Sequence, residues 1–417
     1  MLRLAIAFLA IAFLPAFGES TGQMPEIRDD GFVVEKFAEG IPNSPTTMAF
    51  VGDDILVLQK TDGQVRLVRD GVVQPIPVLD ANVANAGEQG MLGIEAVGTT
   101  VYLYYSESDR DGGEAIAKRV YRYEWNGLGL VNPVLVRDLD ETQFYHNGGG
   151  MVATPDGAVY LALGDAGRYG ALQNHSDELL EDTSVIMRVD KDEPYYSIGI
   201  RNSFGLALDP ATGRLWDTEN GDDDFDEINL VERGSNSGWY PIMGPATEEE
   251  IASLRGYKDY QYSDPEFSWE QVVAPTGLAF VQSEPLEKFS DSLFVGDCNH
   301  GNLYRFTLNE GRDGLAFAGA QLSSDNVANR GDSQEEIIFG TGFGCLTDIE
   351  VGPDGLLYIV SLSEGAIFRI LPEGMVQQQQ QQATDPSWQA YPYYGLGAIA
   401  AAGITVAAYA LRKRRRM

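Results

Sequence analysis

The chain has 417 residues and carries 62 acidic against 29 basic side chains, a formal net charge of −33. This charge excludes nucleic acid as a partner, because binding it requires a basic face. It is compatible with a neutral small molecule or a cation as ligand, and equally with a charge that only keeps the protein soluble.

The N-terminus is predicted to be a secretory signal peptide, residues 1–18. Arg3 supplies a positive charge, residues 4–14 form an uncharged apolar run, and residues 16–18 offer a small-x-small cleavage site. The run is shorter than a membrane span, which favours cleavage over the alternative of an uncleaved anchor. The body of the protein is therefore expected to be exported.

A strand–turn–strand motif recurs six times within residues 32–371. Each copy has two apolar strands joined by a turn of Asp, Gly or Pro, followed by a loop rich in Gly, Asp and Asn. The copies span residues 48–68, 92–105, 151–164, 205–220, 277–306 and 349–370. One such sheet cannot bury both faces alone, whereas radial stacking buries them. The pattern predicts an all-β, six-bladed β-propeller, with one short helix at 247–254 that Thr247 caps.

Four polar segments at strand ends are candidates for the site, because the pocket of a propeller lies in the loops at one end. They are residues 87–93, 145–150, 196–205 and 219–227. The first contains Glu88 and is, from the residues alone, equally a bare turn. The second places His146 among glycines, which suits a general base near neutral pH or a turn histidine bonded to backbone.

The third segment contains Arg201 and Asn202. A guanidinium beside an amide suits a planar, anionic, oxygen-rich ligand, and the alternative is a surface salt bridge. The fourth segment holds five carboxylates in six residues, 222–227. Oxygen ligands in a flexible loop favour calcium, and the alternative is a solvated acidic loop. Their spacing differs from that of an EF-hand.

The two cysteines, Cys298 and Cys345, suit a disulfide if the protein is exported. The sequence does not show whether they are adjacent, so the unpaired alternative stays open.

The C-terminus is predicted to anchor the protein. Residues 375–390 are a glutamine-rich flexible tether, residues 394–411 are an apolar transmembrane helix, and residues 412–417 are a basic cytoplasmic tail. A cleaved lipid-anchor signal is the alternative, but such a signal ends in its apolar part. We expect a single-pass protein of the cell membrane with its propeller on the extracellular face.

Taken in order, the segments resemble the quinoprotein glucose, aldose sugar and sorbosone dehydrogenases over residues 32–371. The motifs that carry the resemblance are His146-Asn147-Gly148-Gly149, Leu163-Gly164-Asp165, Arg201-Asn202, Asp226-Glu227-Ile228-Asn229 leading to Gly238-Trp239, and Pro353-Asp354-Gly355 before Leu357-Tyr358. The resemblance implies pyrroloquinoline quinone (PQQ) at the propeller mouth, with calcium beneath it.

By resemblance, His146 would take the proton from the anomeric hydroxyl of a sugar. Arg201 would stabilise negative charge on the cofactor, with Asn202 alongside and Glu88 as a polar residue against the cofactor. The backbone oxygens of Gly221 and Asp222 would hold the calcium of the cofactor. The resemblance also implies a structural calcium, bound by Asp226 and Glu227.

The chain departs from the family in three places around the cofactor, at a lysine, at an arginine pair and at a histidine. By resemblance, Asn299 and Thr347 lie at cofactor-binding positions. Asn299 stands where a glucose-oxidising relative carries a lysine, and Thr347 stands where it carries an arginine pair. Ile200 replaces a histidine. Contacts of such charged groups with an anionic ligand are each worth about 1.5–3 kcal/mol. His300 is a basic side chain that remains nearby.

The function expected from the sequence is oxidation of an aldose or other alcohol with PQQ and calcium, with electrons passing to a membrane acceptor. One alternative is a non-catalytic, calcium-stabilised surface propeller that binds a glycan or a protein. The other is a lactonase-like, metal-dependent hydrolase in which Glu88, Asn202 and Asp226 converge on one cation.

Overall fold

The computed structural model describes residues 24–139, 142–167, 182–192, 194–254 and 259–376. The predicted signal peptide (1–18), the tether from residue 377 on, the transmembrane helix (394–411) and the basic tail (412–417) lie outside this part. Within it, every helix is too short or too polar to span a bilayer.

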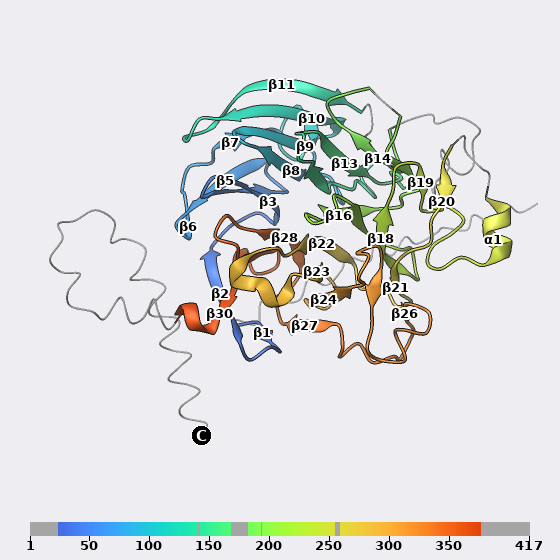
Figure 1. Cartoon of the computed structure of the whole chain (residues 1–417). Coiled ribbons are helices and arrows are strands. Elements are labelled where there is room, and N and C mark those ends of the chain that lie inside the picture. Colours follow the sequence, from blue (N-terminus) through green and yellow to red (C-terminus); the bar gives the residue numbers. More distant parts are fainter. Residues whose placement is uncertain (1–23, 140–141, 168–181, 193, 255–258, 377–417) are drawn as a thin grey trace, which may run out of the picture.

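The described residues form six β-sheets that follow one another in chain order around a central axis (Figure 1). From the axis outward, the first sheet consists of β3 (Pro45–Val51), β4 (Asp54–Gln59), β5 (Gln64–Arg69) and β6 (Val72–Val73), with β7 (Leu79–Asp80) beside β5. The second consists of β8 (Met91–Val97), β9 (Thr100–Ser108), β10 (Ala115–Trp125) and β11 (Leu130–Asp138). The third consists of β12 (Met151–Ala153), β13 (Val159–Leu163), β14 (Val185–Arg188), β15 (Ser197–Ile198), β19 (Ser235–Asn236) and β20 (Gln261–Tyr262).

The other three sheets complete the circle. The fourth sheet consists of β16 (Ser203–Leu208), β17 (Leu215–Glu219), β18 (Asp226–Val231), β21 (Phe267–Trp269) and β26 (Val327–Ala328). The fifth consists of β22 (Pro275–Phe280), β23 (Ser292–Asp297), β24 (Leu303–Leu308), β27 (Ile338–Thr341) and β1 (Glu26–Ile27), with β25 (Leu315–Ala316) beside β24. The sixth consists of β28 (Leu346–Val351), β29 (Leu357–Ser361), β30 (Ala366–Pro372) and β2 (Phe32–Glu39).

The ring is closed by the innermost strands. Each of β3, β8, β12, β16, β22 and β28 contacts the next, and β28 contacts β3 again. In the sixth sheet, β2 from the start of the body pairs with β30 from its end. The all-β propeller predicted from the sequence is therefore confirmed.

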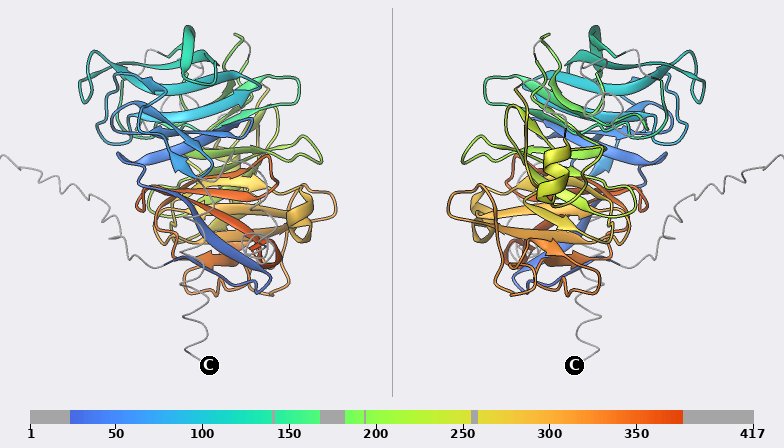
Figure 2. Two further views of the ribbon diagram at one scale, coloured as in Figure 1. Left: turned by 90° about the vertical axis from the view of Figure 1, so that its left-hand side faces the viewer. Right: turned by 90° about the vertical axis from the view of Figure 1, so that its right-hand side faces the viewer.

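Short helical segments decorate the sheets: α1 (Glu248–Ser253), the 3-10 helix η1 (Glu284–Phe289) and a helical turn at 373–376 that follows β30. The predicted helix is confirmed as α1, and Thr247 caps it by accepting a hydrogen bond from the Glu250 amide. This helix lies on the outer surface, far from the axis (Figures 1 and 2).

Apolar side chains fill the spaces between neighbouring sheets. The space between the fourth and fifth sheets is largely aromatic, with Trp216, Phe267, Trp269 and Phe306 all buried. At the axis the inner strands approach so closely that a side chain on Gly277 would lie 2.6 Å from the Asp348 Cα atom. Glycine there lets the sheets converge around a narrow channel.

Candidate active site

The predicted site residues gather at one end of the propeller, here called the mouth. It is the end at which the innermost strands begin and the second strands finish. Glu88 precedes β8, His146 precedes β12, and Arg201 and Asn202 precede β16; Gly221 and Asp222 follow β17, Asp226 and Glu227 begin β18, Asn299 follows β23, and Thr347 lies at the start of β28.

His146 forms a close pair with Asp165. The imidazole Nδ1 lies 2.6 Å from Asp165 Oδ1, and that oxygen also accepts a hydrogen bond from the Gly167 amide at 2.8 Å. The other oxygen, Oδ2, accepts from the indole Nε1 of Trp239 at 2.7 Å. Asp165 is 2% exposed, whereas the His146 side chain keeps 17% of its surface exposed. The histidine thus borders solvent while its partner is enclosed.

The charge of Asp165 decides which nitrogen of His146 is free. Burial acts to raise the pKa of the Asp165 carboxyl, but the hydrogen bonds from His146, Trp239 and Gly167 together hold that pKa below its usual value. An ionised carboxylate can only accept hydrogen bonds, so the Nδ1 of His146 must donate. The lone pair of the neutral ring then lies on Nε2, which is the arrangement of a general base.

Arg201 lies on the neighbouring loop with a nearly buried guanidinium. Its Nη1 donates to the Asn220 carbonyl and its Nη2 to Asp222 Oδ1, both at 2.9 Å. The indole ring of Trp239 lies 5.2 Å from the guanidinium carbon. The buried Nε atom has no hydrogen-bond partner in the described part of the chain. Arg201 therefore brings a fixed positive charge to the mouth.

Glu88 and Asn202 join three of the predicted segments. Glu88 Oε2 accepts from the Asn147 amide at 3.1 Å and from Asn202 Nδ2 at 3.2 Å, and Asn202 Oδ1 accepts from the Gly148 amide at 3.1 Å. Both polar atoms of the buried Asn147 side chain lack a hydrogen-bond partner among the described residues. An unpaired buried amide is costly, so this position suits contact with a polar ligand.

The acidic segment does not gather its carboxylates. Asp222 pairs with Arg201, and Asp224 pairs with Arg330 on another loop. Among the described residues, no group of three or more His, Cys, Asp or Glu side chains is placed to hold a metal ion. The calcium site expected from this segment therefore stays a prediction, without a preformed cluster of side chains behind it.

Asp226 and Glu227 instead brace backbone on opposite faces of β18. The Asp226 carboxylate accepts from the amides of Gly221 and Ala274, each at 2.8 Å, and also from Val273. The Glu227 carboxylate accepts from the amide of Gly244 and from Asn229 Nδ2. Burial raises the pKa of Asp226 to about 6 and that of Glu227 to about 8. The two side chains thus contact different backbone segments, and the structural calcium that the resemblance implies for them stays a prediction.

The carbonyl oxygens of Gly221 and Asp222 remain suited to calcium. No hydrogen bond to either of them is formed by the residues that the structure describes. Carbonyl oxygens are ordinary calcium ligands. The structure thus favours the backbone of this turn over its side chains as a place for the ion.

The fifth and sixth sheets meet at a disulfide. Cys298, after β23, is bonded to Cys345, before β28. Beside it, Asn299 Nδ2 donates to the Val272 carbonyl at 3.4 Å and Thr347 Oγ1 donates to the Pro45 carbonyl at 3.3 Å. Both side chains thus make long contacts with backbone, and they lie on the loops that border the mouth.

His300 lies next to this disulfide and is partly exposed. Its Nδ1 lies 3.8 Å from Asp297 Oδ2. Hydrogen bonding to Asp297 raises the pKa of His300 above its usual value, against the effect of burial. Asp297 therefore favours the protonated form of His300, on the side of the mouth where Asn299 and Thr347 carry no charge.

A narrow channel continues beneath the mouth along the axis. All six innermost strands line it, and its volume is about 20 Å³, room for about one water molecule. Asp348 and Glu350 of β28 line it, and Glu95 of β8 lies near them. Burial raises the pKa values of Glu95 and Asp348 to about 7 each. The mouth is therefore the candidate place for a ligand larger than water.

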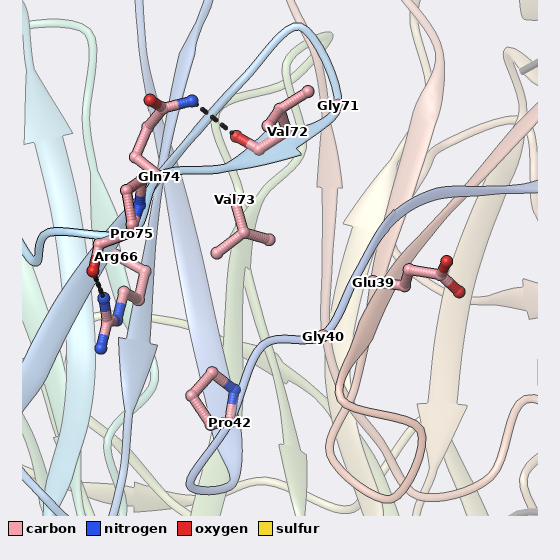
Figure 3. Close-up of a pocket in the computed structure, with 9 residues that line it drawn as sticks. All are labelled: Glu39, Gly40, Pro42, Arg66, Gly71, Val72, Val73, Gln74 and Pro75. Atoms are coloured by element: carbon pink, nitrogen blue, oxygen red, sulfur yellow. Dashed lines mark hydrogen bonds between the residues drawn. The ribbon is translucent and has the colours of Figure 1, made fainter. Parts of the chain in front are cut away.

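A hollow of about 410 Å³ lies elsewhere, on the outer surface between β2 and β6 (Figure 3). Its Arg66 donates to the Pro75 carbonyl at 2.7 Å, and Glu39 points away from that arginine. No titratable side chains converge in this hollow as they do around His146. It is therefore not the candidate site.

Reasoning from the sequence did not identify Asp165 as the partner of His146, Trp239 as the partner of Asp165, or Lys60 as a contact of the loop before β8. The Lys60 Nζ donates to the Gly87 carbonyl at 2.8 Å, and burial lowers its pKa. A signal for Asp165 existed, because β12 and β13 form a hairpin. Residues just before the first strand and just after the second must meet at the same end.

Comparison with known proteins agrees with this geometry. The profile of the Glucose / Sorbosone dehydrogenase family matches residues 42–369. The aldose sugar dehydrogenase YliI of Escherichia coli is 24% identical over 363 residues, which cover 79% of this chain and 90% of the relative. Quinoprotein glucose dehydrogenase B of Acinetobacter calcoaceticus is 25% identical over 293 residues, 60% of each chain. The PQQ-bound aldose sugar dehydrogenase of Streptomyces coelicolor shares the fold, with a TM-score of 0.60 at 22% identity over 84% of this chain and all of that one.

Proposed function

The chain belongs to the glucose/sorbosone dehydrogenase family, and from this membership we propose that it oxidises an aldose or other alcohol with PQQ and calcium. The observation that carries the proposal is the His146–Asp165 pair, which places a general base at the mouth beside the guanidinium of Arg201. Fold alone would not support an activity, because one fold hosts many functions.

The residues of the mouth divide the chemistry among them. When bound, the quinone supplies a two-electron acceptor. His146 Nε2 takes the proton of the hydroxyl on the carbon being oxidised, and the Asp165 carboxylate stabilises the imidazolium that forms. Arg201 offsets negative charge that develops next to it.

The residues present fit the cofactor and its ion. Arg201 and the unpaired amide of Asn147 suit an anionic ligand rich in oxygen. Asn202 and Glu88 contact each other and the backbone of Asn147 and Gly148, and the carbonyl oxygens of Gly221 and Asp222 would hold calcium. Asn299, Thr347 and His300 complete the mouth with fewer positive charges than the resemblance led us to expect. We therefore expect weaker binding of PQQ here than a fully cationic site would give.

The hydrolase alternative loses its third ligand in the structure. Glu88 and Asn202 contact each other, but the Asp226 carboxylate accepts hydrogen bonds from the Gly221 amide and from two amides of the loop before β22. Three converging ligands were the requirement of that alternative, and they are not brought together.

The proposal includes the place of action. The signal peptide (1–18), transmembrane helix (394–411) and basic tail (412–417) predicted from the sequence support the proposal of an exported, membrane-anchored protein with its propeller on the extracellular face. Electrons would then pass to a membrane acceptor. Proteolysis of intact cells that express the full chain tests this, since only an extracellular propeller would be digested.

Binding of PQQ tests the proposed activity directly. The full-length chain, loaded with calcium, would be titrated with PQQ by calorimetry, and turnover would be followed by dye reduction with a panel of aldoses. We expect sugar-dependent reduction that is lost in His146→Ala, with PQQ binding retained. If PQQ in large excess does not bind, the dehydrogenase is excluded, and the non-catalytic propeller that binds a glycan or a protein takes its place.

A further inference from the structure

Trp239 lies between the two side chains that the proposed reaction needs most. It follows β19, is 3% exposed, and its backbone amide donates to the Gly199 carbonyl at 3.1 Å. Gly238 before it has φ +97°, and a side chain there would come within 2.9 Å of Ile242 Cβ. Gly238 thus allows the backbone conformation that places the Trp239 indole here.

The indole contacts both halves of the site at once. Its Nε1–H donates to Asp165 Oδ2, the oxygen that does not face His146. Its ring lies 5.2 Å from the guanidinium carbon of Arg201. His146 and Arg201 come from different loops, and the indole ring of Trp239 connects the two through these contacts.

From this geometry we infer that Trp239 is a positioning residue that aligns the His146 base and Arg201 relative to each other. The inference rests on the proposed function for its effect on turnover. The N–H holds the Asp165 carboxylate so that its other oxygen faces His146 Nδ1, which keeps the proton on Nδ1 and the lone pair on Nε2. The ring face holds the guanidinium by a cation–π contact.

Two substitutions separate these roles. Trp239→Phe keeps a ring beside Arg201 and removes the N–H, so kcat should fall by about tenfold or more while the Kd for PQQ changes little. Trp239→Leu removes both contacts, so the Kd for PQQ should rise as well. The matched control is Trp269→Phe, because Trp269 is fully buried and its Nε1 has no hydrogen-bond partner in the described part of the chain.

A readout without cofactor or turnover separates this inference from the proposed function. The chain has three histidines, so the ¹⁵N resonances of the His146 ring can be assigned with His146→Ala. In the full-length apo protein they should report the Nδ1–H tautomer. In Trp239→Phe they should move towards a mixture of tautomers, and in Trp269→Phe they should stay unchanged. This holds whether or not PQQ binds.

The inference is overturned if Trp239→Phe keeps both the Nδ1–H tautomer and the kcat of the unaltered chain. Should that variant fail to fold, the indole N–H resonance of Trp239 in the unaltered protein provides the test. It should shift with pH together with the His146 ring, because Asp165 joins the two. If the chemical shift of the indole N–H does not change when His146 is protonated, the inference is contradicted.

Discussion

The imidazole of His146 and the carboxylate of Asp165 are 19 residues apart in the chain and 2.6 Å apart in space. The hairpin of β12 and β13 produces this contact, since the two residues flank its open end. The carboxylate is buried and ionised, and the imidazole reaches the mouth. This one contact converts a histidine among glycines into a base with a defined free nitrogen.

Replacing Asp165 by asparagine should remove most of the activity while leaving the fold intact. The amide can donate to His146 Nδ1, which would place the ring proton on Nε2 and abolish the base. General-base catalysis is worth about 10²–10⁴-fold, so kcat should fall within that range. Dye reduction with a saturating sugar measures it. Unchanged kcat in Asp165→Asn would exclude His146 as the base.

Arg201→Ala should mainly weaken PQQ binding. A hydrogen bond to a charged group contributes about 1.5–3 kcal/mol, a change of roughly 10- to 150-fold in Kd. Arg201→Lys keeps the charge but loses the planar fork and its stacking on Trp239, so it should restore only part of the affinity. Calorimetric titration compares the variants. Equal affinity in all three proteins would place the cofactor away from Arg201.

Tyr145 and Phe144 form an exposed aromatic pair next to His146, with 54% and 42% of their surfaces accessible. The main chain at Phe144 is held by the Glu88 amide, so the rings lie on a fixed loop. Loss of one aromatic contact costs about 0.5–1.5 kcal/mol, so Tyr145→Ala should raise KM for a sugar by roughly 2- to 12-fold with kcat unchanged. Ile251→Ala, on the distant α1, is the control. A change in kcat alone would argue against contact with substrate.

The Cys298–Cys345 disulfide should stabilise the protein substantially. It closes a segment with a sequence separation of 47, for which chain entropy predicts about 4 kcal/mol. The double variant Cys298→Ser/Cys345→Ser should therefore unfold at lower urea concentration, and reduction of the unaltered protein should reproduce the change. An identical midpoint with and without the bond would show that the two sheets are held by packing alone.

Stability should fall as pH rises from about 4.5 to about 7, partly because of Glu95. Burial raises the pKa of this carboxyl from 4.5 to about 7, with a smaller contribution from Asp348, against hydrogen bonds from the amides of Ala96 and Ala153. The folded chain holds the proton to higher pH than the unfolded chain, so the stabilisation present at low pH is lost across this window. In Glu95→Gln the difference in unfolding free energy between pH 5 and pH 8 should shrink. Glu310→Gln, at an exposed position, should leave that difference unchanged.

The fold was predictable because each sheet repeats one pattern of strands and turns, and only ring closure satisfies all of them. The location of His146, Arg201, Asn202 and Glu88 at one mouth was predictable for the same reason. The directions in which the carboxylates of the acidic segment point were not predictable. Sequence shows how many carboxylates are near each other along the chain, but not that β18 turns Asp226 and Glu227 to opposite faces, each towards its own backbone amides.

Pairing of the cysteines and the role of Trp239 also lay beyond the sequence. Both depend on the distance between loops that are far apart in the chain, which no local pattern encodes. The hairpin that joins His146 to Asp165 could have been used, because it is local. Contacts within one sheet are therefore the part of a propeller site that sequence reasoning can reach.

The pairing of β2 with β30 sets the order in which this protein can mature. Phe32 pairs with Pro372 and Glu39 with Ala366, so the last sheet waits for the end of the body to be synthesised. Because the chain is synthesised from its N-terminus, β2 stays an unpaired edge during all of that time. Contacts between such distant residues slow folding and expose the intermediate to aggregation. The yield of folded protein should then depend on how well the edge of β2 is protected before β30 is made.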